Sequence, residues 1–234
     1  MGLYSTGGGG GSDFEQHPSG VHMSRCVTVI DCGMQKTTYN GEDKWHNKVW
    51  IAFETPSVRV KWTDKDDVEH EGPAIIGNMY TNSLFEKATL CKHLESWRGR
   101  KFTKEEAGDQ NKPGTFDLFA LLDKPCQLNV IHNEKGDKTY ANIATIMGFA
   151  TSMTVPDRET DLLWYTPGDS EASANFDRLP KWLKEKCTFG HRLDETMTVN
   201  VTGSLDGPAA VPAAHAMPDG RELPPDDFDD RIPF

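Results

Sequence analysis

Cysteine is scarce in this chain, and long apolar runs are missing. The 234 residues include five cysteines, an odd number, and none of them form a Cys-x-x-Cys pair. No apolar stretch near the start has the length or flanks of a signal peptide or a membrane span. These absences argue against a disulfide framework and a membrane anchor, and they favour a protein of a reducing cytosol.

Familiar catalytic motifs are also missing. The sequence has no Gly-rich phosphate loop, no nucleophile elbow and no His-Glu-x-x-His. Cys187 and His191 are four residues apart, but no second ligand pair stands near them to complete a metal site. The acidic pair Asp66-Asp67 could bind Mg²⁺, although a solvated loop accounts for it better. We therefore expect a protein that is not an enzyme and uses no metal or cofactor.

Positive charge is not in excess, since the net charge is -11. The distribution is uneven: residues 194–234 contain nine Asp and Glu against two Arg, whereas residues 21–148 contain 18 acidic and 17 basic residues. A nearly neutral body can still present a basic groove. Charge alone neither requires nor excludes a nucleic-acid partner.

Alternating apolar residues in the body indicate β-strands. In the segment from Trp45 to Glu54, Val49, Ile51 and Phe53 share one face, while Lys48 and Trp50 share the other. Asn40-Gly41 before it is a strong hairpin turn. The same criteria predict four further strands. Their ranges are Val21–Cys32, resuming at Thr37–Tyr39, Pro73–Thr81, Pro125–His132 and Lys138–Gly148. A short protruding arm is expected over residues 58–62.

Helical periodicity interrupts the strands once. Ser83 and Glu86 have the spacing of a capping box, an apolar stripe follows from Leu84 to Trp97, and Gly99 is placed to end the helix. A shorter helix is expected at Phe116–Leu122. Five strands with a helical insertion between the third and fourth predict a mainly β fold, a five-stranded OB-fold barrel.

A barrel of this kind suggests candidates for binding single-stranded nucleic acid, which needs aromatic faces for bases and cations for phosphates. Trp50 is the leading candidate, because it is an aromatic on the polar side of a strand, next to a lysine. The stacking candidates are Trp50, Tyr80, Trp62, Tyr140 and Phe102. The phosphate candidates are Lys48, Arg98, Arg100, Lys101, Arg59 and Lys61.

Each candidate also has a structural interpretation. An aromatic ring is about as well suited to filling a core as to stacking on a base. Arg98 and Arg100 follow a helix and could simply satisfy its last carbonyl groups.

The flanking segments differ in composition from the body. Residues 1–20 are predicted to be a flexible Gly-rich leader, residues 21–150 the OB-fold domain, and residues 151–193 an extension with a short amphipathic helix over Asn175–Lys186. Pro180 near the middle of that helix counts against it. Residues 194–234 are rich in Gly, Pro, Ala and Asp, which predicts a disordered acidic linker.

The last nine residues combine acidic and apolar character. Four aspartates surround Phe228, and Ile-Pro-Phe follows Arg231. A partner pocket could take the Phe234 ring while basic residues on its rim meet the aspartates. This segment resembles the C-terminal tip of bacterial single-stranded DNA-binding proteins. The matching residues are Asp226, Asp227, Phe228, Asp229, Asp230, Ile232, Pro233 and Phe234; Arg231 departs, since an acidic residue is usual there.

The resemblance implies a function. In that family the tip recruits replication, recombination and repair enzymes, and the body binds single-stranded DNA in the cytoplasm. Residues 94–102 and 136–143 also look like OB-type replication proteins of phages and prophages. We therefore expect a sequence-independent single-stranded DNA-binding protein of a bacterial or phage-infected cytosol, without membrane contact. A homo-oligomer is compatible with this, because the family often assembles tetramers. The alternative is a strand-annealing recombination protein, or an adaptor that uses the tip to recruit a host enzyme.

Overall fold

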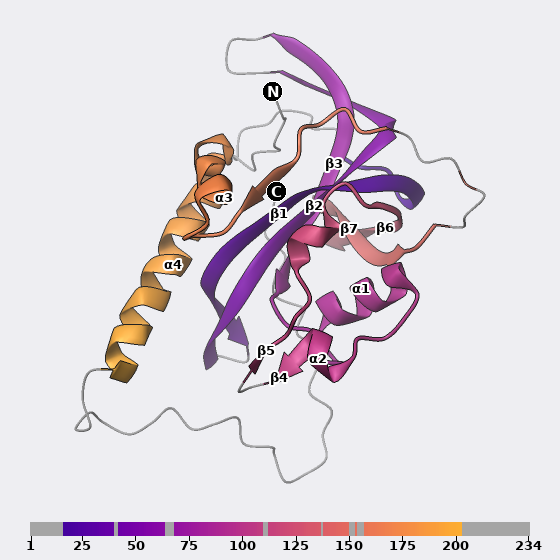
Figure 1. The fold of residues 1–234 in the computed structure, drawn as a ribbon. Helices are drawn as coiled ribbons and strands as arrows, with labels where there is room; N and C mark the ends of the chain where they lie inside the picture. The colour runs from indigo at the N-terminus through magenta and orange to yellow at the C-terminus, as the bar shows by residue number, and fades with distance from the viewer. Residues whose placement is uncertain are drawn as a thin grey trace.

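The structure is a computed structural model that describes residues 16–39, 42–63, 68–109, 112–136, 138–149, 153 and 157–202. The leader up to residue 15 and the tip lie outside these residues. The main sheet consists of β1 (Gly20–Tyr39), β2 (Glu42–Thr63), β3 (Glu69–Thr81), β6 (Pro125–Lys135) and β7 (Lys138–Met147). Its strands are antiparallel in the order β3-β2-β1-β6-β7 and curl into a half-barrel (Figure 1). The predicted mainly β class is confirmed, and the arrangement is compatible with an OB-like fold.

The strands are longer than their apolar patterns suggested. β1 does not stop at Cys32. Two bulges, at Cys26/Thr28 and Asp31/Gly33, each shift the register by one residue, and pairing with β2 continues beyond them to Tyr39. Such bulges bend a strand and increase its twist, which helps the sheet to curl. Gly33 lies at the second bulge with φ +63, a conformation that favours glycine. The expected arm over 58–62 is the continuation of β2, paired with β3 beyond the barrel.

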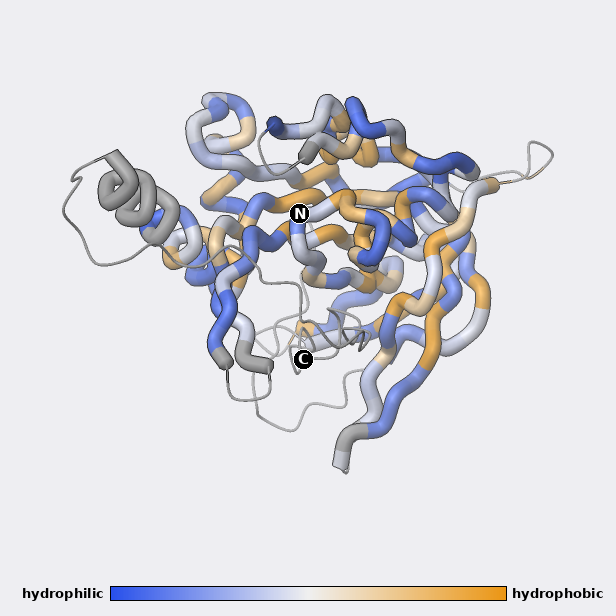
Figure 2. Tube along the Cα trace, turned by 90° about the horizontal axis from the view of Figure 1, so that it is seen from below, coloured by the Kyte–Doolittle hydropathy of each residue, from blue (hydrophilic) through white to orange (hydrophobic). Residues whose placement is uncertain are grey.

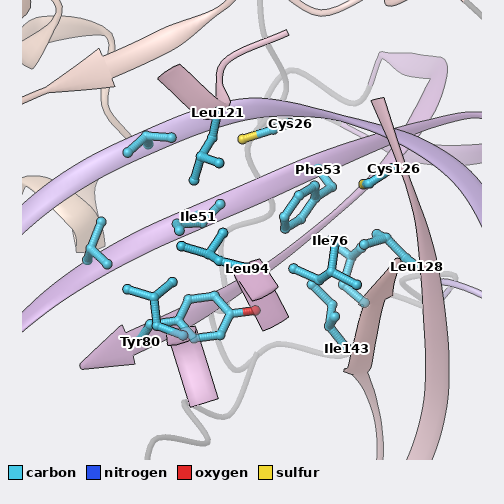
Figure 3. Packing of buried hydrophobic residues seen from close by; sticks show 14 of the residues in the cluster. Cys26, Ile51, Phe53, Ile76, Tyr80, Leu94, Leu121, Cys126, Leu128 and Ile143 are labelled. Atoms are coloured by element: carbon cyan, nitrogen blue, oxygen red, sulfur yellow. The ribbon is translucent and has the colours of Figure 1, made fainter. Parts of the chain in front are cut away.

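The inner side of the half-barrel contains the main core. Val49, Ile51 and Phe53 point inward from β2, as their alternation predicted, and pack against residues of β1, β6 and β7. Figure 3 shows Ile51 beside Leu94, with the Phe53 ring directed toward the middle of the same cluster. In Figure 2 the apolar segments gather in the middle of the molecule. Each of these fully buried side chains contributes about 1.5–3 kcal/mol relative to an exposed position.

Helix α1 (Thr89–Arg98) lies between β3 and β7, which are the two end strands of the sheet. The helix begins later than predicted: its N-cap is Ala88, and Ser83 accepts a hydrogen bond from the amide of Phe85 instead of capping a helix. Its end is as predicted, because Gly99 adopts the left-handed conformation at the C-terminus.

His93 of α1 bridges the two end strands. Its Nε2 lies 3.2 Å from the Ala144 carbonyl oxygen of β7, and its Nδ1 lies 3.0 Å from the Tyr80 hydroxyl of β3. A carbonyl only accepts, so Nε2 donates to Ala144 and the hydroxyl of Tyr80 donates to Nδ1. The imidazole thus links β3 and β7 through a helix.

Acidification is expected to destabilise the protein through His93. Burial lowers the pKa of His93 from 6.5 to about 4. As the pH falls from 6.5 to about 4, the unfolded chain binds a proton that the folded chain excludes, so stability is lost across this window, by up to about 3 kcal/mol. Urea unfolding at several pH values measures the loss. A His93→Gln variant should show a shallower pH dependence, and an unchanged slope would contradict this role.

Short elements connect α1 to β6. They are α2 (Lys104–Ala107), β4 (Gly108–Asp109), β5 (Lys112–Pro113) and the 3-10 helix η1 (Leu118–Leu121). The helix expected at Phe116–Leu122 is therefore shorter and of the 3-10 type. Asp117 caps η1, because its carboxylate accepts from the amide of Phe119.

The C-terminal extension adds a sixth strand to the sheet and places helices on its outer side. It comprises β8 (Leu163–Tyr165), α3 (Ser170–Ala174), the 3-10 helix η2 (Phe176–Arg178) and α4 (Lys181–Thr202). β6 pairs with β1 only as far as Arg25. β8 pairs in parallel with the next part of β1, Thr28–Ile30. In Figure 1 α3 and α4 flank the β1–β2 side of the sheet.

The predicted helix over Asn175–Lys186 is wrong at both ends. Pro180 stands just before α4, where a missing amide hydrogen costs nothing, and its carbonyl accepts from the amides of Leu183 and Lys184. The helix then continues to Thr202, past the predicted start of the linker at residue 194.

Part of the predicted leader also packs on the barrel. His17 is buried, its Nε2 lies 2.9 Å from the Thr55 hydroxyl, and its carbonyl oxygen lies 2.8 Å from Nε2 of His132. Gln16 donates to the carbonyl of Thr139. Residues 16–20 therefore belong to the body, because polar groups on β2, β6 and β7 hold them.

Candidate nucleic-acid interface

Trp50, the leading stacking candidate, lies on the outer side of β2 as its alternation predicted. The expectation that this side is open is wrong: only 7% of Trp50 is exposed. One face of its indole covers Gly77 of β3, where any Cβ would collide with the ring. Trp182 of α4 meets it edge-on, with ring centroids 5.1 Å apart. The extension therefore occupies the surface on which a base would stack.

Lys48 is also buried, contrary to its expected role as a phosphate ligand. Its Nζ donates to the hydroxyl of Thr81, 2.9 Å away, and 1% of the residue is exposed. Further along the same side of β2, the buried Glu54 carboxylate accepts from the amides of Glu159 and Thr160 at 2.8 and 2.6 Å. These bonds fix the start of the extension to the sheet.

The far end of the covered surface is a close crossing of α4 over β1. Gly190 packs against the Cys32 carbonyl, with no room for a Cβ, and a Cβ on Gly33 would lie 2.7 Å from the Gly190 carbonyl carbon. Gln35 donates to the carbonyls of Cys32 and Lys186 at 2.7 and 2.9 Å. The helix is thus held to the strand by close packing and hydrogen bonds.

Tyr80 belongs to the inner core and is 1% exposed. Figure 3 shows its ring among the inward-facing side chains. Its hydroxyl is bonded to His93, so the polar end of the side chain is satisfied inside the barrel. In this fold the ring is not accessible to a base.

Arg98 and Arg100 converge on one carboxylate. Nη2 of each arginine lies within 2.7 Å of Oε1 of Glu106, and the Thr103 amide donates to Oε2 at 2.9 Å. These donors hold the pKa of Glu106 well below its usual range. The Arg98 guanidinium also lies 4.3 Å from the Phe102 ring centroid, a cation–π contact. The carboxylate offsets the positive charge expected for phosphate binding.

Phe102 and Lys101 follow in the same loop. The Phe102 ring packs edge-on against Phe116 at 5.0 Å, so it is part of the support for Arg98. Lys101 is 79% exposed along its side chain, and its Nζ lies 3.6 Å from Glu86, which is equally exposed. An exposed pair of this kind contributes little energy, so Lys101 remains accessible to a phosphate.

The arm formed by the ends of β2 and β3 brings together three candidates. Trp62 is half-buried and stacks on His70 of the opposite strand, with ring centroids 5.5 Å apart and planes 15° from parallel. Lys61 beside it is exposed. Arg59 forms ion pairs with Glu71 and Glu159 at 3.6 and 2.6 Å. The arm extends from the barrel in Figure 1, so Trp62 and Lys61 are the candidates best presented to a ligand.

The remaining candidate, Tyr140, is half-buried on β7, opposite Asn133 of β6, and no other candidate belongs to that strand.

The sequence interpretation missed one aromatic pair. Trp45 of β2 and Phe189 of α4 lie 6.1 Å apart between ring centroids, and Phe189 is 47% exposed. Lys44, next to Trp45, is exposed. Alternation along β2 puts Trp45 on the same side as Val49 and Ile51, so the sequence pattern did not point to it, and its partner comes from a distant helix.

The described residues show no metal site and no membrane-spanning helix. Within the described ranges, no group of three or more His, Cys, Asp or Glu side chains is placed to hold a metal ion. The helices of the described part include none long and apolar enough to cross a membrane. No protein-family model matches the chain, and no curated protein matches it.

Proposed function

We propose that this protein binds single-stranded DNA without sequence preference and recruits partner enzymes through its last nine residues. The main support is a combination: the curled sheet has strand order β3-β2-β1-β6-β7 with a helix after β3, and it belongs to a chain ending in Asp-Asp-Phe-Asp-Asp-Arg-Ile-Pro-Phe. The first is the strand and helix order expected of an OB-fold barrel, which commonly binds oligonucleotides. The second resembles the tip of bacterial single-stranded DNA-binding proteins.

The surface proposed for the DNA differs from the one expected from alternation alone. Because Trp50 lies under the extension and Lys48 is buried, the accessible aromatic ring and cation are Trp62 and Lys61, which are consecutive residues on opposite sides of the arm. The indole offers a planar face of the kind that stacks on any base, and the lysine can meet a neighbouring phosphate. Trp45 with Lys44 offers a similar pairing at the opposite end of β2.

Replacing Trp62 is expected to weaken DNA binding without unfolding the protein. A Trp62→Ala variant of the full chain should lose about 1–3 kcal/mol of affinity for a dT oligonucleotide, the usual effect of removing one stacked base. Lys61→Ala should make the salt dependence shallower by about 0.7 per lost phosphate contact. Fluorescence anisotropy of a labelled oligonucleotide measures both.

Phe85→Ala is the matched control, because Phe85 is 69% exposed and lies away from the arm, in the turn before α1. It should bind as the parent does. A parent chain that does not bind dT at low salt would refute the DNA function and favour the adaptor. A parent that binds, with Trp62→Ala binding equally well, would refute only the assignment of the arm.

A further inference from the structure

The crossing of α4 over β1 brings together two cysteines that the proposed function does not use. Cys32 of β1 and Cys187 of α4 are 155 positions apart in the sequence, and both side chains are fully buried. They belong to the apolar cluster between the outer side of the sheet and the extension, together with Trp50 and Leu183. The sequence has no Cys-x-x-Cys pair, so this contact exists only because the extension docks on the sheet.

The two sulfur atoms lie over the same stretch of β1 backbone. Cys187 Sγ is 3.5 Å from the carbonyl oxygen of Asp31, and Cys32 Sγ is 3.6 Å from the carbonyl oxygen of Ile30. A hydrogen bond between the two thiols, together with their burial, raises the pKa of Cys32 well above its usual value. The two side chains are thus direct neighbours, and Cys32 remains a protonated, unreactive thiol at neutral pH while α4 is docked.

The backbone on both sides of the thiols is in close contact. Gly190, three residues after Cys187, packs against the carbonyl of Cys32 with no room for a Cβ. On the other side, Gln35 of β1 donates to the carbonyl of Lys186 at 2.9 Å. A disulfide requires the two Cα atoms to lie about 4.4–6.8 Å apart. Two elements that touch through their backbones on either side of the thiols can meet this requirement without a large movement.

We propose that Cys32 and Cys187 form a disulfide when the protein meets a peroxide, and that this bond fastens the extension to the sheet. In a reducing cytosol the resting state is the dithiol, in which α4 is held by packing and hydrogen bonds alone. Oxidation adds a covalent link between β1 and α4. Thiol–disulfide exchange with small cytosolic thiols then restores the dithiol.

The oxidation takes two steps. α4 is the last element that the structure describes, and elements near a chain end open locally most readily, which exposes Cys187. The Cys187 thiolate attacks one oxygen of hydrogen peroxide, the O–O bond breaks, and hydroxide leaves a sulfenic acid behind. After α4 docks again, Cys32 loses its proton and attacks the Cys187 sulfur, and the S–O bond breaks with loss of hydroxide. The two thiol protons neutralise the two hydroxides, so two thiols and one peroxide give one disulfide and two waters.

The other three cysteines are equally buried but differently placed. Cys26 of β1 and Cys126 of β6 belong to the inner core, and their strands pair with each other in the sheet. Cys91 lies in α1, on the inner side as well. A peroxide reaches these thiols only when the barrel itself opens. They are therefore internal controls for oxidation that follows opening of the extension.

The test treats the folded, reduced full chain with excess hydrogen peroxide and maps the product by mass spectrometry. Cleavage before aspartate separates Cys26 from Cys32, because Asp31 stands between them. The product should join the peptides of Cys32 and Cys187, leave the other three cysteines as thiols, and revert with dithiothreitol. Because the bond closes a loop of 155 positions, the oxidised chain should unfold about 10 °C higher than the reduced chain.

Cys187→Ala should lose both the crosslink and the shift in unfolding temperature. Cys91→Ala, the matched control at another buried cysteine, should keep both. Five intact thiols after treatment, a Cys26–Cys126 bond in place of the expected one, or sulfinic acid at Cys187 without a crosslink would overturn the inference. So would a crosslinked chain that unfolds no higher than the reduced one. The comparison of the reduced and oxidised parent needs no substitution and contains no DNA, so it depends neither on the folding of a variant nor on the proposed function.

Discussion

A Trp50→Ala substitution should lower the free energy of unfolding of the full chain by about 3–5 kcal/mol. The indole fills the space between Gly77 of β3 and Trp182 of α4, and 7% of it is exposed. Its loss removes apolar contact on both sides and leaves a cavity that neither the sheet nor the docked helix can easily close. Urea unfolding followed by circular dichroism measures the change.

Trp62→Ala is the matched control, since Trp62 is a half-buried indole on the projecting arm of the same strand. It should cost much less stability. Gly77→Ala tests the same packing from the other side, because the added Cβ would push the Trp50 ring toward α4. If Trp50→Ala were as stable as the parent but bound DNA weakly, the indole would be accessible and the docked position of α4 would be wrong.

The outcome also affects how DNA-binding data are interpreted. A destabilised Trp50 variant would lose DNA affinity by unfolding, although the indole touches no base. Binding therefore has to be compared at a temperature where the variant is folded. A loss of affinity that disappears under these conditions identifies Trp50 as a structural residue.

The sequence predicted on which side of the sheet each β2 residue lies. It did not predict which segment of the chain covers the outer side. Alternation placed Phe53 inside and Trp50 outside, and both placements are correct. Whether an outer position meets water depends on a segment more than a hundred residues later in the chain. The apolar stripe of Leu179 and Leu183 in the extension was the available signal, because such a stripe needs an apolar surface to pack on.

A capping box does form in this part of the chain, but it caps α2 and not α1. Two segments have the spacing of a capping box, Ser83 with Glu86 and Thr103 with Glu106, and the structure uses the second. The same Glu106 side chain then binds Arg98 and Arg100. The sequence shows both the capping box and the two arginines. The contact between the Glu106 carboxylate and the arginines depends on the turn at Gly99, which brings the arginines back toward α2. Local patterns therefore could not show that these cations are already paired.

Removing residues 226–234 should abolish recruitment of a partner enzyme and leave the DNA affinity equal or higher. These residues lie outside the described part of the chain, so the expectation depends on their sequence. Phe234 offers a ring for a partner pocket, and the aspartates steer toward a basic rim. Residues 194–234 have a net charge of -7, and the deletion removes four of their aspartates together with Arg231. These aspartates can compete with phosphates for the same lysines, because a tethered segment is present at high effective concentration.

Two substitutions separate the ring from the charge. Phe234→Ala keeps every aspartate, so it should lose the partner and retain the parent's affinity for dT. Changing Asp226, Asp227, Asp229 and Asp230 to asparagine keeps the ring, so it should slow association with the partner and raise DNA affinity at low salt. A purified bacterial replication or repair enzyme that binds the similar tip of bacterial single-stranded DNA-binding proteins serves as the probe. If Phe234→Ala bound this enzyme as tightly as the parent, the segment would act only through its charge, and pocket capture would be refuted.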